Sequence, residues 1–338
     1  FIEMKTIVLT LMICLFPLAI VLTRKYKVVK LIDNTGIQNL IPTNKAIPLR
    51  PNSIKPPKPK YERRQFVYKY DEHDVFYYEF LKCSQEQKKL PVLIVCFMGG
   101  HSKSACIRRM ASRLSKEHDV YILLPRGSLD TTIDPAQKKF RSEGYDTEDI
   151  ESLVALIGKC YLVGYSLGGL TVGHYLAQTQ QKLVQKAFLG FTEHDPDHST
   201  KIPEKFKIML GNCLLSYITN NMDYFLSHGF SQEQMADILS TKTIIRYDEV
   251  VWCKNGETVH DYYNGVSLKQ RIQHFKVPTL FFNTQDDIIC GPTFLEEEIK
   301  QNKNVNLVVI NKGNHLGGLL KNGSDMPSIV AEKFFKDQ

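Results

Sequence analysis

The chain has 338 residues, of which 43% are hydrophobic and 23% are charged, so it is long enough to bury one large core or two smaller ones. Its net charge of +7 comes largely from basic residues before residue 65, and no basic-aromatic signature follows, which argues against nucleic-acid binding. The eight cysteines form no CxxC pair, so their spacing indicates buried thiols in a reducing environment rather than zinc or a disulfide scaffold.

An uncharged stretch, TIVLTLMICLFPLAIVLT, occupies residues 6–23 near the amino end. A helix of this length rises about 27 Å, which is enough to cross a hydrocarbon core. The alternative is a cleaved signal peptide, but no small-residue cleavage site follows. Residues 1–30 therefore predict a single-pass membrane anchor with a basic flank.

The anchor could leave the rest of the chain on either of two sides of the membrane. Four basic residues at 24–30 follow the span and only Lys5 precedes it, which favours a carboxyl-terminal domain on the cytoplasmic side. A signal anchor of opposite orientation would place the domain in a lumen, with which the sequon at 322–324 is compatible. The membrane is an endomembrane such as that of the ER, or the plasma membrane.

Residues 31–60 predict a linker, because the segment 42–60 is rich in proline and lysine and is typical of an extended, semi-rigid tether. From residue 61 to residue 338 the pattern alternates and predicts one α/β domain. Eight apolar runs predict its strands: FVYKY (66–70), VFYYEFL (75–81), VLIVCF (92–97), VYILLP (120–125), CYLVG (160–164), AFLGF (187–191), TLFFN (279–283) and NLVVIN (306–311).

Helix-like stretches lie between or after the later strands, at 104–117, 146–157, 167–180, 292–302 and 327–336. Several strands are continuous apolar runs, which is typical of a mostly parallel sheet with helices on both faces. Residues 195–272 break the alternation with helical patterns between the sixth and seventh strands. An insertion there lies near the carboxyl ends of the strands, so we predict a helical lid over a site.

The segment YLVGYSLGGL (161–170) places Ser166 between a predicted strand and a predicted helix, with Gly164 and Gly168 on either side. This G-x-S-x-G pattern is typical of a nucleophile elbow, in which a sharp turn projects the serine hydroxyl off the sheet. The glycines remove side chains that would collide. The following helix directs the amide of Leu167 toward the same position, where it can stabilise an oxyanion.

A serine hydroxyl needs a base, and in this chain order the base follows an acid. His315 lies in a short loop after the last predicted strand, whereas the contexts of His174, His194 and His198 are weaker. The acid is expected after the preceding strand, where Asp287 is favoured and Asp286 is the alternative.

The second oxyanion donor is expected in the turn CFMGGHS (96–102), after the third predicted strand, and the amide of Met98 is the candidate. Chemistry of this kind requires no metal and no organic cofactor.

These motifs resemble the α/β-hydrolase superfamily, and within it the membrane-anchored α/β-hydrolase domain-containing 1, 2 and 3 group, the AB hydrolase-4 family. The likeness covers about residues 60–335. It rests on LPRGS (124–128), EGYDTEDIESLVALI (143–157), VGYSLGG (163–169), YDE (247–249), HDYYNGVS (260–267), VPTLFFNTQDD (277–287) and NHLGG (314–318). The residues that match the lid-to-core segment of the group are Tyr247, Asp248, Glu249, Asp261, Tyr262, Tyr263 and Ser267.

The resemblance implies an α/β-hydrolase fold with a triad at Ser166, Asp287 and His315, and hydrolysis of lipid acyl esters such as monoacylglycerols or phospholipids. Two features depart from the group. Cys96-Phe97 stands where a histidine-glycine or proline-glycine pair is usual, and the H-x4-D box linked to acyl transfer is absent. We therefore expect a membrane-bound serine esterase or lipase. The alternative is a catalytically weak scaffold that binds a lipid or a partner protein at a membrane.

Overall fold

The computed structural model describes residues 28–34, 56–128, 130–141, 146–253, 256–291, 294–317 and 325–336. The predicted anchor, most of the predicted linker and the sequon at 322–324 lie outside the described residues. Within the described ranges, no helix combines the length and the apolar character that crossing a bilayer would require.

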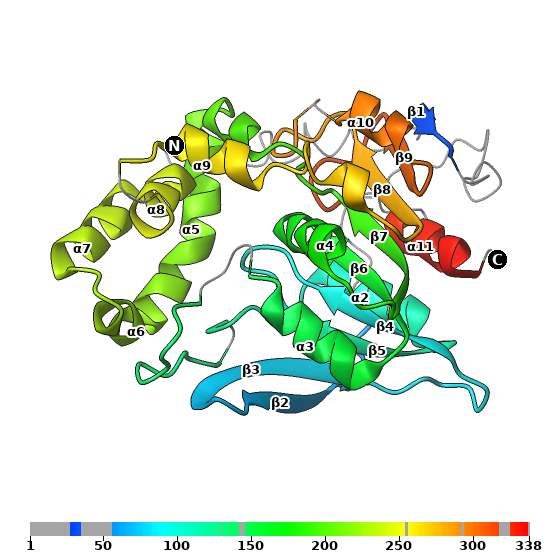
Figure 1. Cartoon of the computed structure of the whole chain (residues 1–338), viewed down its shortest axis with the longest axis horizontal. Coiled ribbons are helices and arrows are strands. Elements are labelled where there is room, and N and C mark those ends of the chain that lie inside the picture. Colours follow the sequence, from blue (N-terminus) through cyan, green and yellow to red (C-terminus); the bar gives the residue numbers. More distant parts are fainter. Residues whose placement is uncertain are drawn as a thin grey trace, which may run out of the picture.

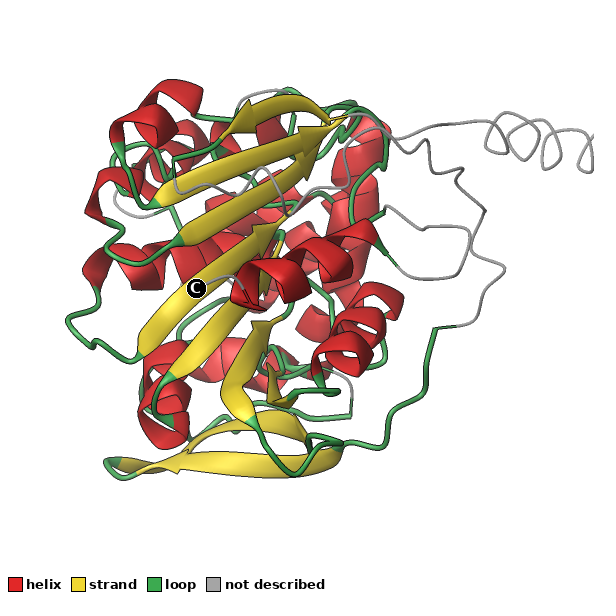
Figure 2. Ribbon diagram, turned by 90° about the vertical axis from the view of Figure 1, so that its right-hand side faces the viewer, coloured by secondary structure: helices red, strands yellow, loops and turns green. Residues whose placement is uncertain are grey.

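One twisted sheet runs through the middle of the molecule (Figure 1 and Figure 2). Its strands are β1 (Val28–Ile32), β2 (Glu62–Tyr68), β3 (Asp71–Leu81), β4 (Lys89–Val95), β5 (His118–Leu123), β6 (Cys160–Tyr165), β7 (Val184–Gly190), β8 (Thr279–Thr284) and β9 (Val305–Ile310). The strand order is β1-β9-β8-β7-β6-β4-β5-β3-β2. The pairs from β5 to β9 are parallel, and antiparallel pairs add β1 at one edge and β3 and β2 at the other.

The eight predicted strands are all present, but the predicted total of eight is wrong, because the described part of the chain contributes nine strands to the sheet. The additional strand is β1, which pairs with β9 from Val28 opposite Ile310 to Ile32 opposite Leu307. It lies in the segment that we assigned to the basic flank and the linker, where lysines surround a short apolar run. Lys30 of β1 forms an ion pair with Glu296 beyond β8, so the strand is tied to the domain by side chains as well.

Helices cover both faces of the sheet, as the continuous apolar strands predict. One face packs against α2 (Ala105–Leu114) and α11 (Met326–Lys336), and the other against α3 (Glu148–Ile157), α4 (Leu167–Gln178), α10 (Glu296–Gln301) and the short helix η3 (Ile272–His274). Within β4, Val92 and Ile94 belong to the first core, whereas Leu93 and Val95 belong to the second. The two cores hold the carboxyl ends of the parallel strands in fixed positions.

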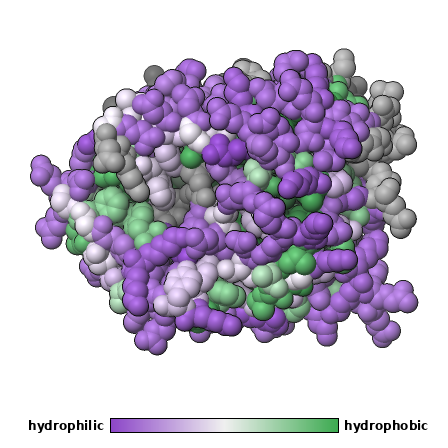
Figure 3. Space-filling model, viewed as in Figure 1, coloured by the Kyte–Doolittle hydropathy of each residue, from purple (hydrophilic) through white to green (hydrophobic). Residues whose placement is uncertain are grey.

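The predicted insertion forms a separate helical layer beside the sheet, labelled α5 to α9 in Figure 1. It comprises η2 (Pro196–Thr200), α5 (Glu204–Asn220), α6 (Met222–Ser227), α7 (Gln232–Thr241), α8 (Ile244–Val251) and α9 (Val259–Val266), all between β7 and β8. The lid has a hydrophobic cluster of its own, which includes Leu214, Tyr217 and Phe225. In the space-filling view, most of this face is hydrophilic, and apolar side chains emerge among the lid helices (Figure 3).

The lid is joined to the body of the molecule through Tyr224 of α6. Its ring stacks on Phe140 at a centroid distance of 5.6 Å, and its hydroxyl donates a hydrogen bond of 2.9 Å to the carbonyl of Arg141. Because Tyr224 is fully buried, this contact fixes the position of α6 against the body of the domain.

Candidate active site

Ser166 lies on a strained turn between β6 and α4. Its φ of 52° and ψ of −121° are a conformation that side-chain-bearing residues rarely adopt. The Ser166 amide donates to the carbonyl of Gly190 at 3.0 Å, and its own carbonyl accepts from the amides of Gly169 and Leu170 at 2.9 and 3.0 Å. The turn is therefore held by backbone hydrogen bonds from both flanking elements, and the hydroxyl is left at the start of α4.

The two glycines of the pattern are required by close backbone contacts. A Cβ on Gly164 would lie 2.6 Å from the Cα of Gly169. A Cβ on Gly168 would lie 2.2 Å from the carbonyl oxygen of Cys96, at the end of β4. The turn thus packs directly against the segment from which the second oxyanion donor is expected.

Gly168→Ala is expected to lower the free energy of unfolding by about 1–3 kcal/mol, because the added methyl group has to push the turn and β4 apart. The matched control is Gly265→Ala, at a position of α9 where no atom lies within 4 Å of the added Cβ. That change should leave stability unchanged or raise it slightly, since alanine favours helix. Denaturant titrations of both variants provide the measurement, and equal effects would contradict the packing argument.

The structure brings Ser166, His315 and Asp287 together from three separate loops. The Nε2 of His315 lies 2.9 Å from Ser166 Oγ, and its Nδ1 lies 2.8 Å from Asp287 Oδ2. The other carboxylate oxygen of Asp287 accepts from the amides of Ile289 and Cys290 at 2.9 and 3.1 Å. Burial alone would raise the pKa of Asp287, but His315 and these amide donors lower it below its ordinary value.

The alternative acid, Asp286, points elsewhere. Its carboxylate accepts a hydrogen bond of 2.9 Å from the amide of Asn314, so it holds the loop that carries His315. Asn314 and Leu316, on either side of the histidine, both have positive φ. The neighbouring Gly317 is needed for a close approach, because a Cβ there would lie 1.7 Å from the carbonyl oxygen of Gly313.

Two of the other histidines considered from the sequence, His174 and His194, have different hydrogen-bond partners. His174 is buried in α4, and one of its ring nitrogens lies 2.7 Å from the carbonyl oxygen of Val266. His194 is buried, and a ring nitrogen lies 3.3 Å from the side-chain oxygen of Asn283. Burial lowers the pKa of each to about 4, so both are neutral at physiological pH.

Met98 and Leu167, the two predicted oxyanion donors, line the same cavity as Ser166. Neither backbone amide has an acceptor within the described part of the chain. Phe97 precedes Met98 without a positive φ, and its carbonyl accepts from the amide of Gly100 at 2.7 Å. A side chain at position 97 therefore fits this turn without backbone strain.

A cavity that is partly open to solvent lies between Ser166 and the lid. Its lid side is mostly apolar and aromatic, with Leu210 and Leu214 from α5, Ile244 and Tyr247 from α8, and Trp252 just after it. Two acidic side chains also line the cavity, Glu193 after β7 and Asp248 on α8. The lining therefore places an apolar and aromatic surface, interrupted by two acids, next to the serine.

The two acids are held by hydroxyl groups. Tyr263 of α9 donates to Asp248 at 2.5 Å, and Ser199 donates to Glu193 at 2.7 Å. Burial raises the pKa of Asp248 to about 7, although the bond from Tyr263 partly opposes it, and burial also raises the pKa of Glu193 well above its ordinary value. Sequence reasoning singled out Asp248 and Tyr263 only by family likeness and did not foresee either acid in the cavity.

Asp248 should make stability depend on pH. Its pKa of about 7 in the folded chain exceeds the ordinary value, so the unfolded chain binds fewer protons and stability falls as the pH rises through this range. Between pH 5 and pH 8 we expect a loss of about 3 kcal/mol that Asp248→Asn removes. Unfolding titrations at both pH values test this, with Glu233→Gln, an exposed acid of the same lid, as control. Identical pH slopes for the native chain and Asp248→Asn would contradict it.

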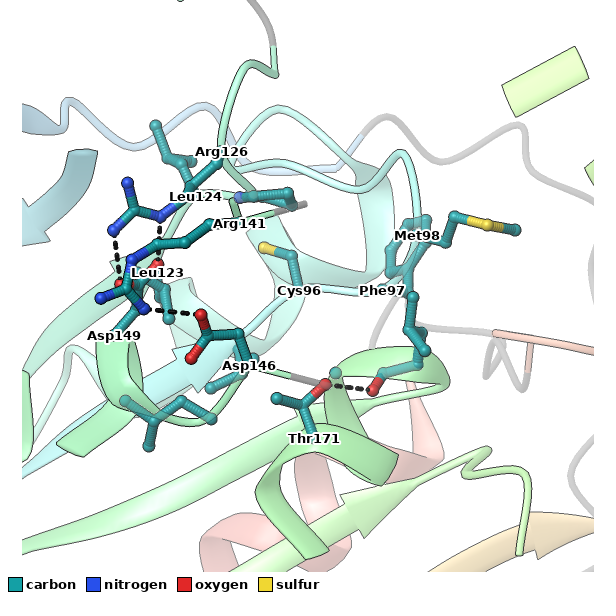
Figure 4. Close-up of a pocket in the computed structure, with 15 residues that line it drawn as sticks. Cys96, Phe97, Met98, Leu123, Leu124, Arg126, Arg141, Asp146, Asp149 and Thr171 are labelled. Atoms are coloured by element: carbon teal, nitrogen blue, oxygen red, sulfur yellow. Dashed lines mark hydrogen bonds and ion pairs between the residues drawn. The ribbon is translucent and has the colours of Figure 1, made fainter. Parts of the chain in front are cut away.

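A second cavity is also lined by Met98 and Leu167 and is drawn in Figure 4. Its charged residues face one another: Arg126 pairs with Asp149 at 2.7 Å, and Arg141 pairs with Asp146 at 2.6 Å. Arg126 lies in the LPRGS motif, so this motif contributes a buried, paired guanidinium group to the cavity.

Cys290 lies beside the pair formed by His315 and Asp287, and sequence reasoning missed it because it ends an apolar run. Its thiol donates to the carbonyl of Phe191 at 2.9 Å, and its sulfur lies 3.6 Å from His315 Nδ1. Burial, with Asp287 and Glu193 adding to it, raises the pKa of this thiol well above its ordinary value. The group is therefore a neutral thiol next to the imidazole.

Comparison with curated proteins finds relatives that include a phospholipase and an abhydrolase domain-containing protein. Phospholipase ABHD3 of Homo sapiens is 27% identical over 192 residues, which cover 52% of this chain and 46% of that protein. The chain spans about half the length of the curated relatives it matches. No family model matches the sequence.

Solved structures share the fold at low identity. MGS-M2, an α/β hydrolase from a Medee basin deep-sea metagenome library, superimposes with a TM-score of 0.51 at 14% identity, over 81% of this chain and 98% of that one. A bacterial membrane phospholipase A gives 0.51 at 15% identity, over 82% and 85%. The chain therefore has the α/β-hydrolase fold, and about half of it is similar in sequence to phospholipase ABHD3.

Proposed function

We propose that the chain is a serine hydrolase that cleaves acyl esters of lipids through Ser166, His315 and Asp287. The single observation that carries the proposal is the continuous contact from Ser166 Oγ to His315 Nε2 at 2.9 Å and from Nδ1 to Asp287 at 2.8 Å. A hydroxyl, an imidazole and a carboxylate in this order are the parts of a nucleophilic triad.

In the proposed mechanism, Ser166 attacks the acyl carbonyl while His315 takes its proton at Nε2. Asp287 holds the Nδ1 proton and stabilises the imidazolium that forms. The amides of Leu167 and Met98 donate to the oxyanion, and each such donor contributes about 3–4 kcal/mol to the transition state. His315 then gives the proton to the leaving alcohol, and water releases the acyl-enzyme by the reverse steps.

The substrate class follows from the cavity and from the relatives. The aliphatic and aromatic lid residues, among them Leu214 and Trp252, offer an apolar surface next to Ser166. The human relative is a phospholipase by name. We therefore propose lipid esters, monoacylglycerols or phospholipids, presented at a membrane that the predicted anchor at residues 6–23 would hold close.

The test is hydrolysis by the full chain of a panel that contains a monoacylglycerol, a phospholipid and a short p-nitrophenyl ester. We expect turnover of at least one lipid ester. The substrate with the highest kcat/KM then shows which lipid headgroup the site prefers. If well-folded chain hydrolyses none of them, the alternative of a lipid-binding or protein-binding scaffold replaces this proposal.

A further inference from the structure

A carboxylate, a thiol and an imidazole converge on one point behind the candidate serine. One ligand atom each from Asp287, Cys290 and His315 can be chosen so that all three lie within 4.8 Å of one another. The first two residues come from the turn after β8, and the third comes from the loop after β9. Oxygen, sulfur and nitrogen donors of these types are those that zinc prefers in proteins.

The spacing of the donors is close to the spacing that a tetrahedral zinc ion imposes. Zinc–sulfur and zinc–nitrogen bonds of about 2.3 and 2.0 Å set the two donor atoms about 3.5 Å apart. Cys290 Sγ and His315 Nδ1 are 3.6 Å apart. Asp287 Oδ2 lies 2.8 Å from the same nitrogen, so oxygen and nitrogen would have to separate by about 0.5 Å. The carboxylate would also have to rotate off the Nδ1 axis, because the metal takes the place that the hydrogen bond between them now occupies.

The orientation of the thiol also suits a metal. Its hydrogen is directed to the carbonyl oxygen of Phe191 at 2.9 Å, which leaves sulfur lone pairs available on the side of His315. The backbone amide of Cys290 donates to the other oxygen of Asp287, so the carboxylate and the thiol are fixed on one turn. Cys290 and Asp287 are both buried, and His315, which borders Ser166, is the least buried of the three.

We infer that Asp287, Cys290 and His315 form an inhibitory site for Zn²⁺ or a similar thiol-seeking divalent cation. On binding, a metal–sulfur bond replaces the bond from sulfur to hydrogen, and that proton passes to solvent. A metal–nitrogen bond at Nδ1 displaces the proton there, and the neutral ring carries it at Nε2 instead. Nε2 then has no lone pair to accept the proton of Ser166. The inhibition rests on the proposed function, whereas the binding itself does not.

Binding is tested first without any hydrolysis. Co²⁺ is added to the full chain carrying Ser166→Ala, and thiolate-to-cobalt absorption is recorded in the near ultraviolet. We expect this absorption to appear with Co²⁺, to disappear with excess Zn²⁺, and to be lost when Cys290→Ser is added. Cys213→Ser, on the exposed face of α5, is the matched control and should leave it unchanged. Absorption that persists without Cys290, or that never appears, would overturn the site.

Inhibition is then measured as the Zn²⁺ concentration that halves ester hydrolysis. Cys290→Ser retains a donor for the carbonyl of Phe191, so the fold should persist, and the response of each protein to Zn²⁺ is normalised to its own turnover in the presence of a chelator. The half-inhibitory Zn²⁺ concentration of the variant should rise at least tenfold, and a chelator should restore activity of the native chain. Equal sensitivity of the two proteins would overturn the inhibitory role. A chain that shows no hydrolysis but gives the cobalt spectrum would contradict the proposed function and leave the metal site standing.

Discussion

Ser166→Ala is expected to lower kcat/KM for any ester substrate by at least about 10³-fold, and by up to about 10⁶-fold if the three groups act as a unit. The hydroxyl is the only atom group that the substitution removes, and alanine is compatible with the same turn geometry as serine. The fold should persist, because the turn is held by the backbone contacts of Ser166 with Gly190, Gly169 and Leu170. The measurement is steady-state hydrolysis together with a thermal melt.

The control for this change is a serine that also lines the cavity. Ser199 donates to Glu193 and lies at the lid side, so Ser199→Ala should alter KM more than kcat. If Ser166→Ala retained activity within tenfold of the native chain while Ser199→Ala did not, Ser166 would not be the nucleophile.

Asp287→Asn is expected to lower kcat by about 10⁴-fold, the scale seen when a triad acid becomes an amide. The carboxylate accepts a hydrogen bond of 2.8 Å from the Nδ1–H group of His315. An amide in its place favours the wrong tautomer and cannot stabilise the imidazolium. The shape of the side chain is kept, and its remaining oxygen can still accept from the amides of Ile289 and Cys290.

The adjacent acid offers a matched comparison. Asp286→Asn keeps an oxygen that can accept from the amide of Asn314, so we expect a loss of only a few-fold, caused by a less rigid histidine loop. Comparing kcat for the two variants distinguishes the acids. Losses of equal size, or a larger loss at Asp286, would reverse the assignment.

Local signals in the sequence were sufficient for most of the fold. Most of the eight predicted strands are apolar runs whose length and boundaries mark them as buried strands, whereas β2, at the sheet edge, is largely exposed. Strand β1 was missed because its five residues lie among lysines and gain stability only from pairing with β9. Nothing within Val28–Ile32 itself distinguishes a sheet edge from a membrane flank, since the partner is about 280 residues away.

The candidate site also contains residues that the sequence predicts and residues that it does not. Ser166 and its glycines form a contiguous pattern, and His315 follows from the order of the chain in this fold. Between Asp286 and Asp287 the sequence leaves a choice, because the conformation of the turn decides which carboxylate faces the histidine. Cys290 and the acids of the cavity could not be predicted, since their positions depend on how the lid and three distant loops pack together.

The most direct test of the central claim is to map where a fluorophosphonate probe attaches to the full chain. We predict a single adduct on Ser166 in folded protein, found by mass spectrometry of the peptide that spans the turn, and no adduct after heat denaturation. Folded protein that carries the adduct at another residue, or that carries none at all, would contradict the account.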